Sequence, residues 1–332
     1  MAEWLYEPGI GEARAALIEG GRIVEMLIEP DGERLRAGAV VDARVMRKAD
    51  ASGRARVDLG EAGEAWLVSG AGAIAEGTRL RVEIVREALP EAGAFKPPHV
   101  RPVETTAPLR AAPDLAVRIA ATGHALRRAP AGEDLFEAHG WSESLEEASR
   151  GIVARADAML RISLTPAMTL IDVDGPRDAA TLACAGARLA GEAIRRFDIA
   201  GSIGIDLPTL ANKADRLAAA LALDGALPQP FERTAVNGFG FLQVVRRRVR
   251  ASLPELLAAD PIGAAARALL RRAERARGHG PLMLAAAPVV IERLAAKPDW
   301  LDELTRRTGV AIALSPAAGL AISAGHAQHE HA

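Results

Sequence analysis

The stretch TLIDVDG, residues 169–175, carries two acids within an otherwise apolar, strand-like run. Asp172 and Asp174 are two positions apart, so the alternation of side chains along a strand points both to one face. A third acid, Asp206, ends the strand-like run GSIGID. Carboxylates are the ligands that hard divalent cations such as Mg2+ take up. These acids are therefore candidates for metal-dependent chemistry, although a strand-end Asp is also common as a simple cap of a loop or helix.

The segment between the two runs predicts how the acids meet. PRDAATLACAGARLAGEAIRRF, residues 176–197, has the periodicity of an amphipathic helix. A strand–helix–strand crossover normally makes its strands parallel, and their carboxyl ends then share the sheet edge where open α/β sheets bind ligands. Neighbouring strands lie about 5 Å apart, so Asp172 and Asp206 would repel each other unless a cation or a proton lies between them. We therefore expect a shared metal site, to which Asp174 adds a third oxygen.

The bulk composition indicates a globular protein. The chain has 332 residues, of which 49% are hydrophobic and 25% charged, and this excludes a disordered chain. The formal net charge of -2 says nothing about nucleic acid, so only local clusters of charge bear on it. Cys184 is the one cysteine, which excludes an internal disulfide and a cysteine-based zinc site. The N-terminus lacks a signal-peptide core and no apolar run has membrane-spanning length, so we expect a cytoplasmic protein.

Other segments have recognisable patterns. A Gly20–Gly21 turn between two strand-like runs predicts a hairpin. Short strand-like runs from about residue 37 to 90 predict a small antiparallel barrel, and the proline-rich FKPPHVRP, residues 95–102, predicts a linker. Near the end, VAIALSPAAGLAIS, residues 310–323, predicts a closing hairpin, and GHAQHEHA predicts a flexible tail.

In this order, the segments resemble the ribonuclease E/G family over nearly the whole chain. The run EARAALIEGGRIVEMLIEPDG resembles the first hairpin of the family's RNase H-like subdomain, and RAGAVVDARVMRKADASGRARVDLGEAGEAWLV resembles its S1 barrel. TPAMTLIDVDG and AGSIGIDL resemble the two catalytic strands, IDINS or IDVNS and GGLIVIDF, and NGFGFLQVVRRRVRASL resembles SRFGLLEMSRQRLRPSL. APVVIERLAAKPDWLDELTRRTGVAIALSP resembles the C-terminal small domain. No single match is decisive, and it is their order that indicates the family.

The resemblance implies a multidomain fold of the α/β (α+β) class: an S1-like OB barrel, RNase H-like and DNase I-like catalytic α/β subdomains, and a small C-terminal α/β domain. The implied boundaries are an RNase H-like hairpin over 1–36, an S1-like RNA-binding barrel over 37–100, the rest of the RNase H-like subdomain over 101–162, a DNase I-like catalytic subdomain over 163–252, a C-terminal small domain over 253–325 and a flexible tail over 326–332. The candidate acids would then lie in the DNase I-like subdomain.

The resemblance also implies an activity. In the family, two strand-end aspartates hold one Mg2+ and activate water against an RNA phosphodiester, and these positions are Asp172 and Asp206 here. Asp174 would assist the metal or orient the water. We therefore expect a metal-dependent endoribonuclease that cleaves single-stranded RNA in RNA processing, such as rRNA processing, or in RNA decay. Mg2+ is the expected cofactor, with Mn2+ as an alternative and no zinc, and no membrane partner is expected.

Three residues of the barrel region are predicted RNA contacts. Trp66 falls where the family has an aromatic side chain that stacks on a base; a half-buried core tryptophan is an equal alternative. Arg56 stands in place of a second aromatic and would stack by its guanidinium or contact phosphate. Lys96 is a further phosphate contact, although a plain linker lysine explains it better.

A basic run, RRRVR, follows the third catalytic-domain strand. Strand alternation would point Arg246, Arg248 and Arg250 to one face. This predicts a phosphate track beside the metal, with Arg246 and Arg248 as its main contacts. The alternative is a solvated edge strand protected by charge.

The chain departs from the family at several positions. The family's Asn after the first aspartate is Asp174 here, the second acid of its DFIDM motif is replaced by Thr209, and the Glu of GLLEM is Gln243. The 5′-sensor insertion has almost no room between Phe95 and Pro130, and the zinc-link cysteines are absent. We therefore expect a reduced member without a zinc-linked tetramer, and a homodimer stays open. The alternative is a catalytically weak or inactive RNA-binding protein on the same scaffold.

Overall fold

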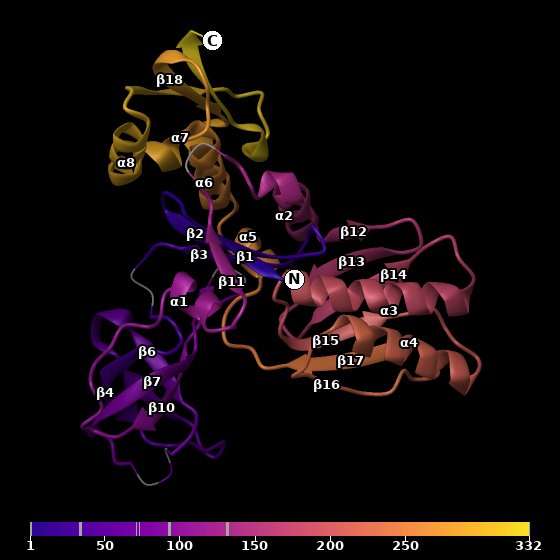
Figure 1. Ribbon diagram of the computed structural model, residues 1–332. Coiled ribbons are helices and arrows are strands. Elements are labelled where there is room, and N and C mark those ends of the chain that lie inside the picture. The colour runs from indigo at the N-terminus through magenta and orange to yellow at the C-terminus, as the bar shows by residue number, and fades with distance from the viewer. Residues whose placement is uncertain are drawn as a thin grey trace. The chain divides into compact units, whose positions relative to one another are not determined.

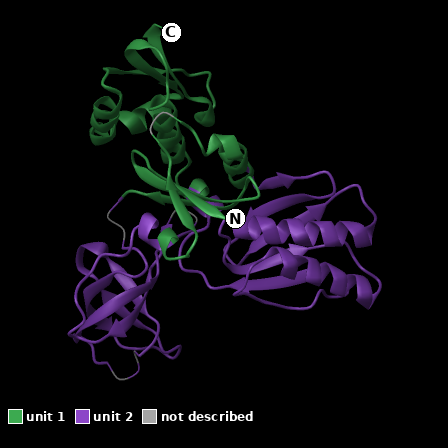
Figure 2. Ribbon diagram, in the orientation of Figure 1, with its two compact units in different colours: residues 1–31, 119–149, 257–332 green, residues 32–118, 150–256 purple. Residues whose placement is uncertain are grey.

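A computed structural model describes residues 2–32, 35–70, 72, 74–91, 94–130 and 133–331. The protein is of the mixed α/β class and contains several sheets, one of which is a closed five-stranded barrel (Figure 1). It divides into two compact units (Figure 2). Unit 1 gathers residues 1–31, 119–149 and 257–332, and unit 2 gathers residues 32–118 and 150–256.

The first sheet of unit 1 has the strand order β11-β1-β2-β3. Its strands are β1 (Glu3–Pro8), β2 (Glu12–Glu19), β3 (Arg22–Pro30) and β11 (Ala125–Arg128). The predicted hairpin is confirmed, because β2 and β3 pair antiparallel across Gly20 and Gly21, whose φ angles of 57° and 79° favour glycine. The short helix α1 (Leu115–Ala120) precedes β11, and α2 (Trp141–Arg150) follows it.

Charged side chains are buried between the separate segments of unit 1. Arg14 of β2 pairs with Glu7 of β1 at 2.7 Å and with Asp134 at 3.2 Å. Glu12 of β2 pairs with Arg267 at 2.7 Å and also with Arg271. Glu12 and both of these arginines are less than 9% exposed, so the ion pairs are part of the interior.

The C-terminal part of unit 1 is a small α/β subdomain, formed by helices and a three-stranded sheet. After α5 (Leu253–Ala259), which begins in unit 2, come α6 (Pro261–Ala273), α7 (Pro288–Ala295) and α8 (Pro298–Thr308). The helices accompany a three-stranded sheet, β19-β18-β20, formed by β18 (His279–Ala286), β19 (Ile312–Pro316) and β20 (His326–His331). The core contains Leu269, Leu284, Leu294 and Leu304.

Two expectations for this region were wrong. The closing hairpin over 310–323 does not form, because β19 pairs parallel with β18 and residues 317–325 lead into β20. The expected flexible tail is a strand over residues 326–331, since β20 pairs antiparallel with the other edge of β18. The polar composition of HAQHEH concealed this strand, whose Ala327 packs against the core.

The barrel of unit 2 is formed by β4 (Val40–Arg47), β5 (Ala55–Asp58), β6 (Glu64–Leu67), β7 (Arg79–Arg86) and β10 (His99–Val103). Its strand order is β10-β6-β5-β4-β7, and β7 closes the ring onto β10. Val57, Leu67, Val82 and Val100 fill the interior. The expected linker over 95–102 is therefore wrong in part, because its second half is the barrel strand β10. A small hairpin, β8 (Leu89–Glu91) and β9 (Ala94–Lys96), lies between β7 and β10 in the chain.

The second part of unit 2 is a six-stranded sheet with the order β12-β13-β14-β15-β17-β16. Its strands are β12 (Ile152–Ala154), β13 (Met159–Leu164), β14 (Thr169–Asp174), β15 (Gly201–Asp206), β16 (Glu232–Arg233) and β17 (Phe241–Arg246). The helices α3 (Ala179–Arg196) and α4 (Lys213–Ala226) lie side by side on one face (Figure 1). Strand residues that face these helices are buried, and most residues of the opposite face, which we call the open face, are exposed.

Candidate functional site

The open face of the six-stranded sheet brings two of the predicted acids together. β14 and β15 are adjacent and parallel, and Asp172 is the register partner of Asp206. The crossover that the sequence predicted, a strand, the helix α3 and a parallel neighbouring strand, is therefore confirmed. Partners on adjacent strands have Cα atoms about 5 Å apart. Both side chains are exposed, and Ile171 and Ile205 beside them are buried on the helix face, so both carboxylates lie on the open face.

The two acids belong to one row of register partners across four strands. Arg161 of β13 is the partner of Asp172, and Phe241 of β17 is the partner of Asp206. The row therefore reads Arg161, Asp172, Asp206, Phe241. Sequence reasoning missed Arg161, although the alternation in MLRISL, residues 159–164, indicates a strand whose Arg161 faces away from the core.

Asp174 lies one step further along β14 on the same face as Asp172. Its Oδ2 atom is 3.4 Å from Nε of Arg161. Both side chains are more than half exposed, so this is a weak surface ion pair. Asp174 therefore lies near the pair of acids and is ion-paired with Arg161. It is not a register partner of either Asp172 or Asp206.

The side chains suit a small site for a hard cation. Among the described residues, no three or more His, Cys, Asp or Glu side chains converge as a metal cage would require. Two carboxylates on the open face are nevertheless a donor set that Mg2+ accepts, because this ion keeps several waters and is often held by one or two carboxylates together with substrate phosphates. The pair Asp172 and Asp206 therefore fits Mg2+ in chemistry, with water and phosphate completing the coordination.

Glycine shapes the surface next to the pair. A Cβ atom on Gly204 would lie 2.6 Å from the ring of Phe241 and 2.9 Å from a methyl group of Leu170. A larger side chain at position 204 would therefore force these two apolar side chains to move away from β15 beside Asp206. The aromatic and aliphatic groups form the floor next to the carboxylates.

The predicted phosphate track at Arg246 and Arg248 is wrong. β17 ends at Arg246, so strand alternation does not reach Arg248 or Arg250. Arg246 follows Leu242 and Val244 on the helix face and donates to the carbonyl oxygen of Ile199 at 2.7 Å. Its register partner is Gly201, at the end of β15 away from Asp206, which is about 17 Å along the strand.

The next two arginines are also held by contacts within unit 2. Arg248 donates to the carboxylate of Glu255. Arg250 lies 3.9 Å from carboxylate oxygens of Glu87 and of Asp198. These side chains stabilise the end of the sheet, and none of them lies beside the acid pair.

The barrel carries a second row of register partners, on its outer surface. Arg56 of β5 is the partner of Trp66, Trp66 is the partner of His99, and His99 is the partner of Arg86. All four side chains are half-buried, whereas Ala65 and Leu67 on either side of Trp66 are buried inside the barrel. Trp66 is therefore not a core residue. Sequence reasoning found Arg56 and Trp66 but missed His99 and Arg86, because the parallel pairing of β6 with β10 brings them in from distant positions.

Ion pairs with nearby acids already engage two of the predicted RNA-binding residues, Arg56 and Lys96. The guanidinium of Arg56 lies over the Trp66 ring, 4.7 Å from its centroid, and is ion-paired with Glu64. Arg56 therefore covers part of the ring surface on which a base would stack. Lys96 ends β9 and pairs with Glu91 across the small hairpin at 2.8 Å.

Positive charge gathers at the other end of this row. The pKa of His99 is lowered from 6.5 to about 4, mainly by burial and also by the positive charges of the neighbouring Arg86 and Arg54. Burial likewise lowers the pKa of Arg86 to about 10, with Arg248 and Arg54 contributing. The Nε atom of Arg86 is buried without a hydrogen-bond partner among the described residues. An anionic group would relieve this repulsion, so this end of the row is suited to phosphate.

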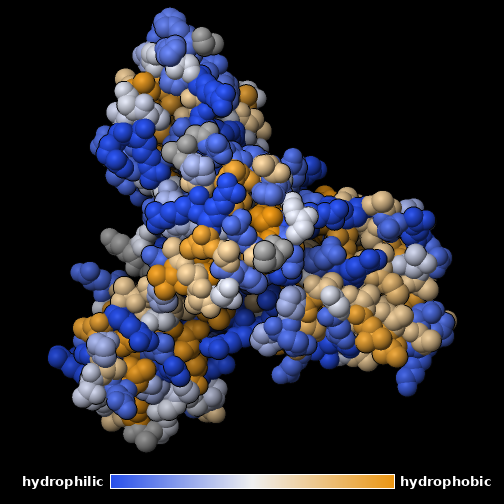
Figure 3. Space-filling model, viewed as in Figure 1, coloured by the Kyte–Doolittle hydropathy of each residue, from blue (hydrophilic) through white to orange (hydrophobic). Residues whose placement is uncertain are grey.

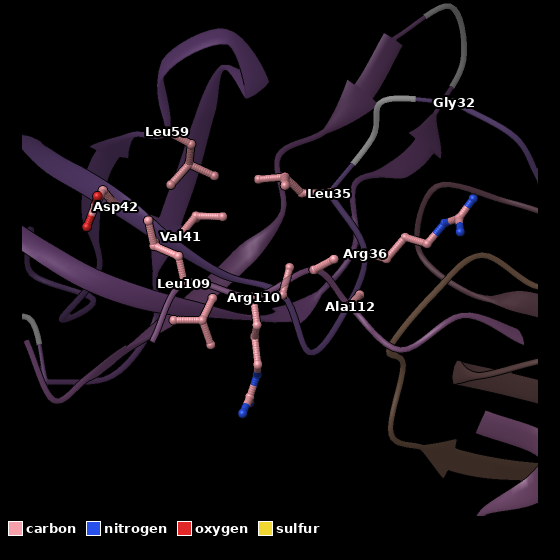
Figure 4. A pocket seen from close by; sticks show the side chains of 12 residues that line it. Gly32, Leu35, Arg36, Val41, Asp42, Leu59, Leu109, Arg110 and Ala112 are labelled. Atoms are coloured by element: carbon pink, nitrogen blue, oxygen red, sulfur yellow. The ribbon is translucent and has the colours of Figure 1, made fainter. Parts of the chain in front are cut away.

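A separate hollow lies beside the barrel and does not contain the acid pair. Its volume is about 680 Å³, and Figure 4 shows Leu35, Val41, Leu59 and Leu109 around it. Arg110 at its rim donates to the carbonyl oxygen of Gly38 at 3.2 Å. The hollow is mainly apolar, and its lining does not include any of the predicted site residues.

No protein-family model matches the chain, and a search of curated proteins finds no match. Among the described residues, no helix has both the length and the apolar character needed to cross a membrane.

Proposed function

We propose that this chain is a divalent-metal-dependent endoribonuclease that cleaves single-stranded RNA, with a role in RNA processing or decay. The observation that carries the proposal is the register pairing of Asp172 with Asp206 on adjacent parallel strands. Exposed carboxylates held this close repel each other, and such an arrangement is stable when a cation lies between them. Hydrolysis of a phosphodiester is the reaction that such a cation most directly serves.

In this proposal each charged residue of the open face has a separate role. Asp172 and Asp206 bind Mg2+, or Mn2+ in its place, and the bound cation supplies positive charge and lowers the pKa of a water. Asp174 accepts a hydrogen bond from the attacking water and orients it. Arg161 donates to a non-bridging oxygen of the phosphate, for which it would exchange its weak contact with Asp174.

The barrel supports RNA as the substrate. If β4, β5, β6, β7 and β10 are numbered 1 to 5, hydrogen-bonded neighbours around the barrel follow the order 1-2-3-5-4-1. This order arises because β6 pairs with β10 and β4 pairs with β7. We infer an OB fold from this order, a fold that binds oligonucleotides on its second and third strands and adjoining loops. Arg56 and Trp66 lie on those two strands. Arg54 lies in the loop between β4 and β5, and Lys96 lies in the connection between β7 and β10.

The resemblance to the ribonuclease E/G family remains a further support. On this proposal the barrel is its S1 domain, the six-stranded sheet is its DNase I-like subdomain, and the first sheet of unit 1 is its RNase H-like subdomain. The departures at Asp174, Thr209 and Gln243 make the chain a reduced member. It would work without a 5′-sensor and without a zinc-linked assembly.

A second candidate function is RNA binding without efficient catalysis. The observation that favours it is the ion pair between Asp174 and Arg161, which leaves two carboxylates rather than three for a metal. The row of register partners on the barrel, Arg56, Trp66, His99 and Arg86, would then be the RNA-binding surface, and the acid pair would no longer support catalysis. The two candidates share the fold and the ligand, and they differ only in whether RNA is cleaved.

Cleavage of a labelled, A/U-rich single-stranded RNA separates the two candidates. We expect wild-type protein to cleave with Mg2+ and not with EDTA, and Asp172→Asn and Asp206→Asn each to lose at least about a hundredfold in rate, since each removes a ligand of the cation. Asp224→Asn, at an exposed acid of α4 that pairs with Arg233 away from the open face, is the matched control. RNA binding by all variants without cleavage by any would establish the second candidate. Absence of both binding and cleavage would reject both.

A further inference from the structure

Phe239 is the most exposed large hydrophobic side chain among the described residues, at 83%. It lies in the turn NGFG, residues 237–240, immediately before β17. Exposing a whole phenyl ring to water is unfavourable, by about 25 cal/mol per Å² of apolar surface. Its chain neighbours Asn237 and Gly238 are polar or small and also exposed, so they do not cover the ring.

The turn that carries this ring is held by side-chain and backbone contacts. Oδ1 of Asn237 accepts hydrogen bonds from the backbone N–H groups of Phe239, at 2.9 Å, and of Phe241, at 3.0 Å. Gly240 has a φ of 94°, and a Cβ atom there would collide with the carbonyl oxygen of Leu207. The ring is therefore presented by a fixed backbone and not by a loose loop.

The same contacts place the ring at the edge of the sheet where the acid pair lies. The N–H of Leu207, the residue after Asp206, donates to the carbonyl oxygen of Gly240 at 3.2 Å. The hydroxyl of Thr209 donates to the carbonyl oxygen of Phe239 at 3.4 Å. Phe241, two residues after Phe239, is the register partner of Asp206. The exposed ring thus belongs to the turn that borders the carboxyl end of β15.

We infer that Phe239 is a stacking platform for a nucleobase of the RNA strand that passes the Asp172–Asp206 pair. This inference rests on the proposed RNA-directed function and adds a base-binding position to it. An exposed aromatic ring on a fixed backbone, beside the proposed phosphate-binding site, matches the way in which single-stranded nucleic acid is held, by base stacking next to backbone contacts. A protein partner would instead need a contiguous apolar surface of several hundred Å².

Another apolar surface lies on the opposite side of the sheet and carries no such inference. Figure 3 shows apolar surface gathered over the helix layer, where Leu217 and Leu221 of α4 are each 56% exposed. Nothing in the structure shows what would cover this surface. Leu217 does provide a matched control, because it is a large exposed hydrophobic residue on the same domain but not on the open face.

The test is a scan of abasic positions through a short single-stranded RNA, with binding measured in EDTA so that cleavage does not occur. In wild-type protein, removal of the base that stacks on Phe239 should weaken binding about 5- to 150-fold, the equivalent of about 1–3 kcal/mol per stacked base. Phe239→Ala should weaken binding of the intact RNA by the same factor and abolish the effect of that one abasic position. Phe239→Trp should retain it, and Leu217→Ala should match the wild type.

The other outcomes overturn the inference in distinguishable ways. An abasic profile that Phe239→Ala leaves unchanged, in a protein that still cleaves RNA with Mg2+, rejects the stacking platform and preserves the nuclease. A change from dimer to monomer in Phe239→Ala, measured by light scattering, would mean that a second copy of the chain covers the ring. Failure of the wild type to bind any RNA would reject the proposed function together with the platform.

Discussion

At the residue scale, the open face combines acids and a base in an order that the strand pairing fixes. Arg161, Asp172 and Asp206 occupy consecutive positions of one row, so a phosphate bound at the acid pair through a cation would have a guanidinium on one side. Arg161 is exposed and only weakly engaged by Asp174, at 3.4 Å. It is therefore available to turn towards a substrate.

Arg161→Gln should lower kcat/KM for RNA cleavage about fivefold, because an exposed charge contact is worth about 1 kcal/mol and about 1.4 kcal/mol corresponds to tenfold. The loss should appear mainly in KM at low salt. Arg306→Gln is the control, since Arg306 of α8 is also well exposed, at 72%, and is paired with an acid, Glu303. Equal losses in the two variants would mean that general surface charge, and not the row, supports cleavage.

His99 gives a prediction for stability against pH. Burial, Arg86 and Arg54 lower its pKa from 6.5 to about 4, so between these values the unfolded chain takes up a proton that the folded chain does not. The free energy of unfolding should therefore fall as the pH is lowered from 6.5 towards 4. Urea unfolding across this range should show a smaller loss in His99→Gln than in the wild type. Bound RNA should reduce the loss, because phosphate favours the protonated imidazole.

At the element scale, the crossover through α3 is what brings the acids into register. Gly186 of α3 lies against Val173, the residue between Asp172 and Asp174, and leaves no room there for a Cβ atom. The helix therefore packs directly on the strand that carries the site. Gly225 near the end of α4 has nothing within 4 Å of the position that a Cβ atom would occupy, so packing does not require glycine there.

This contrast predicts opposite effects for the same substitution. Gly186→Ala should lower the free energy of unfolding by about 1–3 kcal/mol, because it forces α3 away from β14. Gly225→Ala should raise it by about 0.5–1 kcal/mol, because alanine costs less backbone entropy in a helix. Denaturant titration of both variants checks the pair. A stabilising Gly186→Ala would show that α3 adjusts without strain.

The elements that could be predicted from the sequence are those with a strong local pattern. The Gly20–Gly21 hairpin and the β14–α3–β15 crossover follow from turn chemistry and periodicity, and the crossover carries the pairing of Asp172 with Asp206. The prediction of an arginine track was wrong because β17 ends at Arg246, four residues before Arg250, and because the alternation of its side chains places Arg246 on the helix face. The prediction of a flexible tail in place of β20 was wrong because the partner strand, β18, lies about fifty residues earlier in the chain. Local composition does not reveal such a pairing.

At the scale of the whole molecule, the net charge of -2 gives no long-range attraction for RNA. Binding must then depend on a few clustered cations, such as Arg54, Arg56 and Arg86 on the barrel. Arg54→Gln should reduce the slope of log K against log salt concentration by about 0.7, the value for one phosphate contact on a single strand. Arg306→Gln on α8, where the side chain is 72% exposed, should leave the slope unchanged. A slope that neither change alters would exclude Arg54 from the RNA path.

The discontinuous make-up of unit 1 has a consequence for how the protein is made. On the ribosome, β1 and β2 emerge first, but the arginines that neutralise Glu12 lie at residues 267 and 271. All of unit 2 has therefore been synthesised before Glu12 of β2 meets its charged partners. Until then burial of Glu12 would leave its charge without a partner, so the apolar side chains of β1 and β2 stay exposed longer, which favours contact with chaperones.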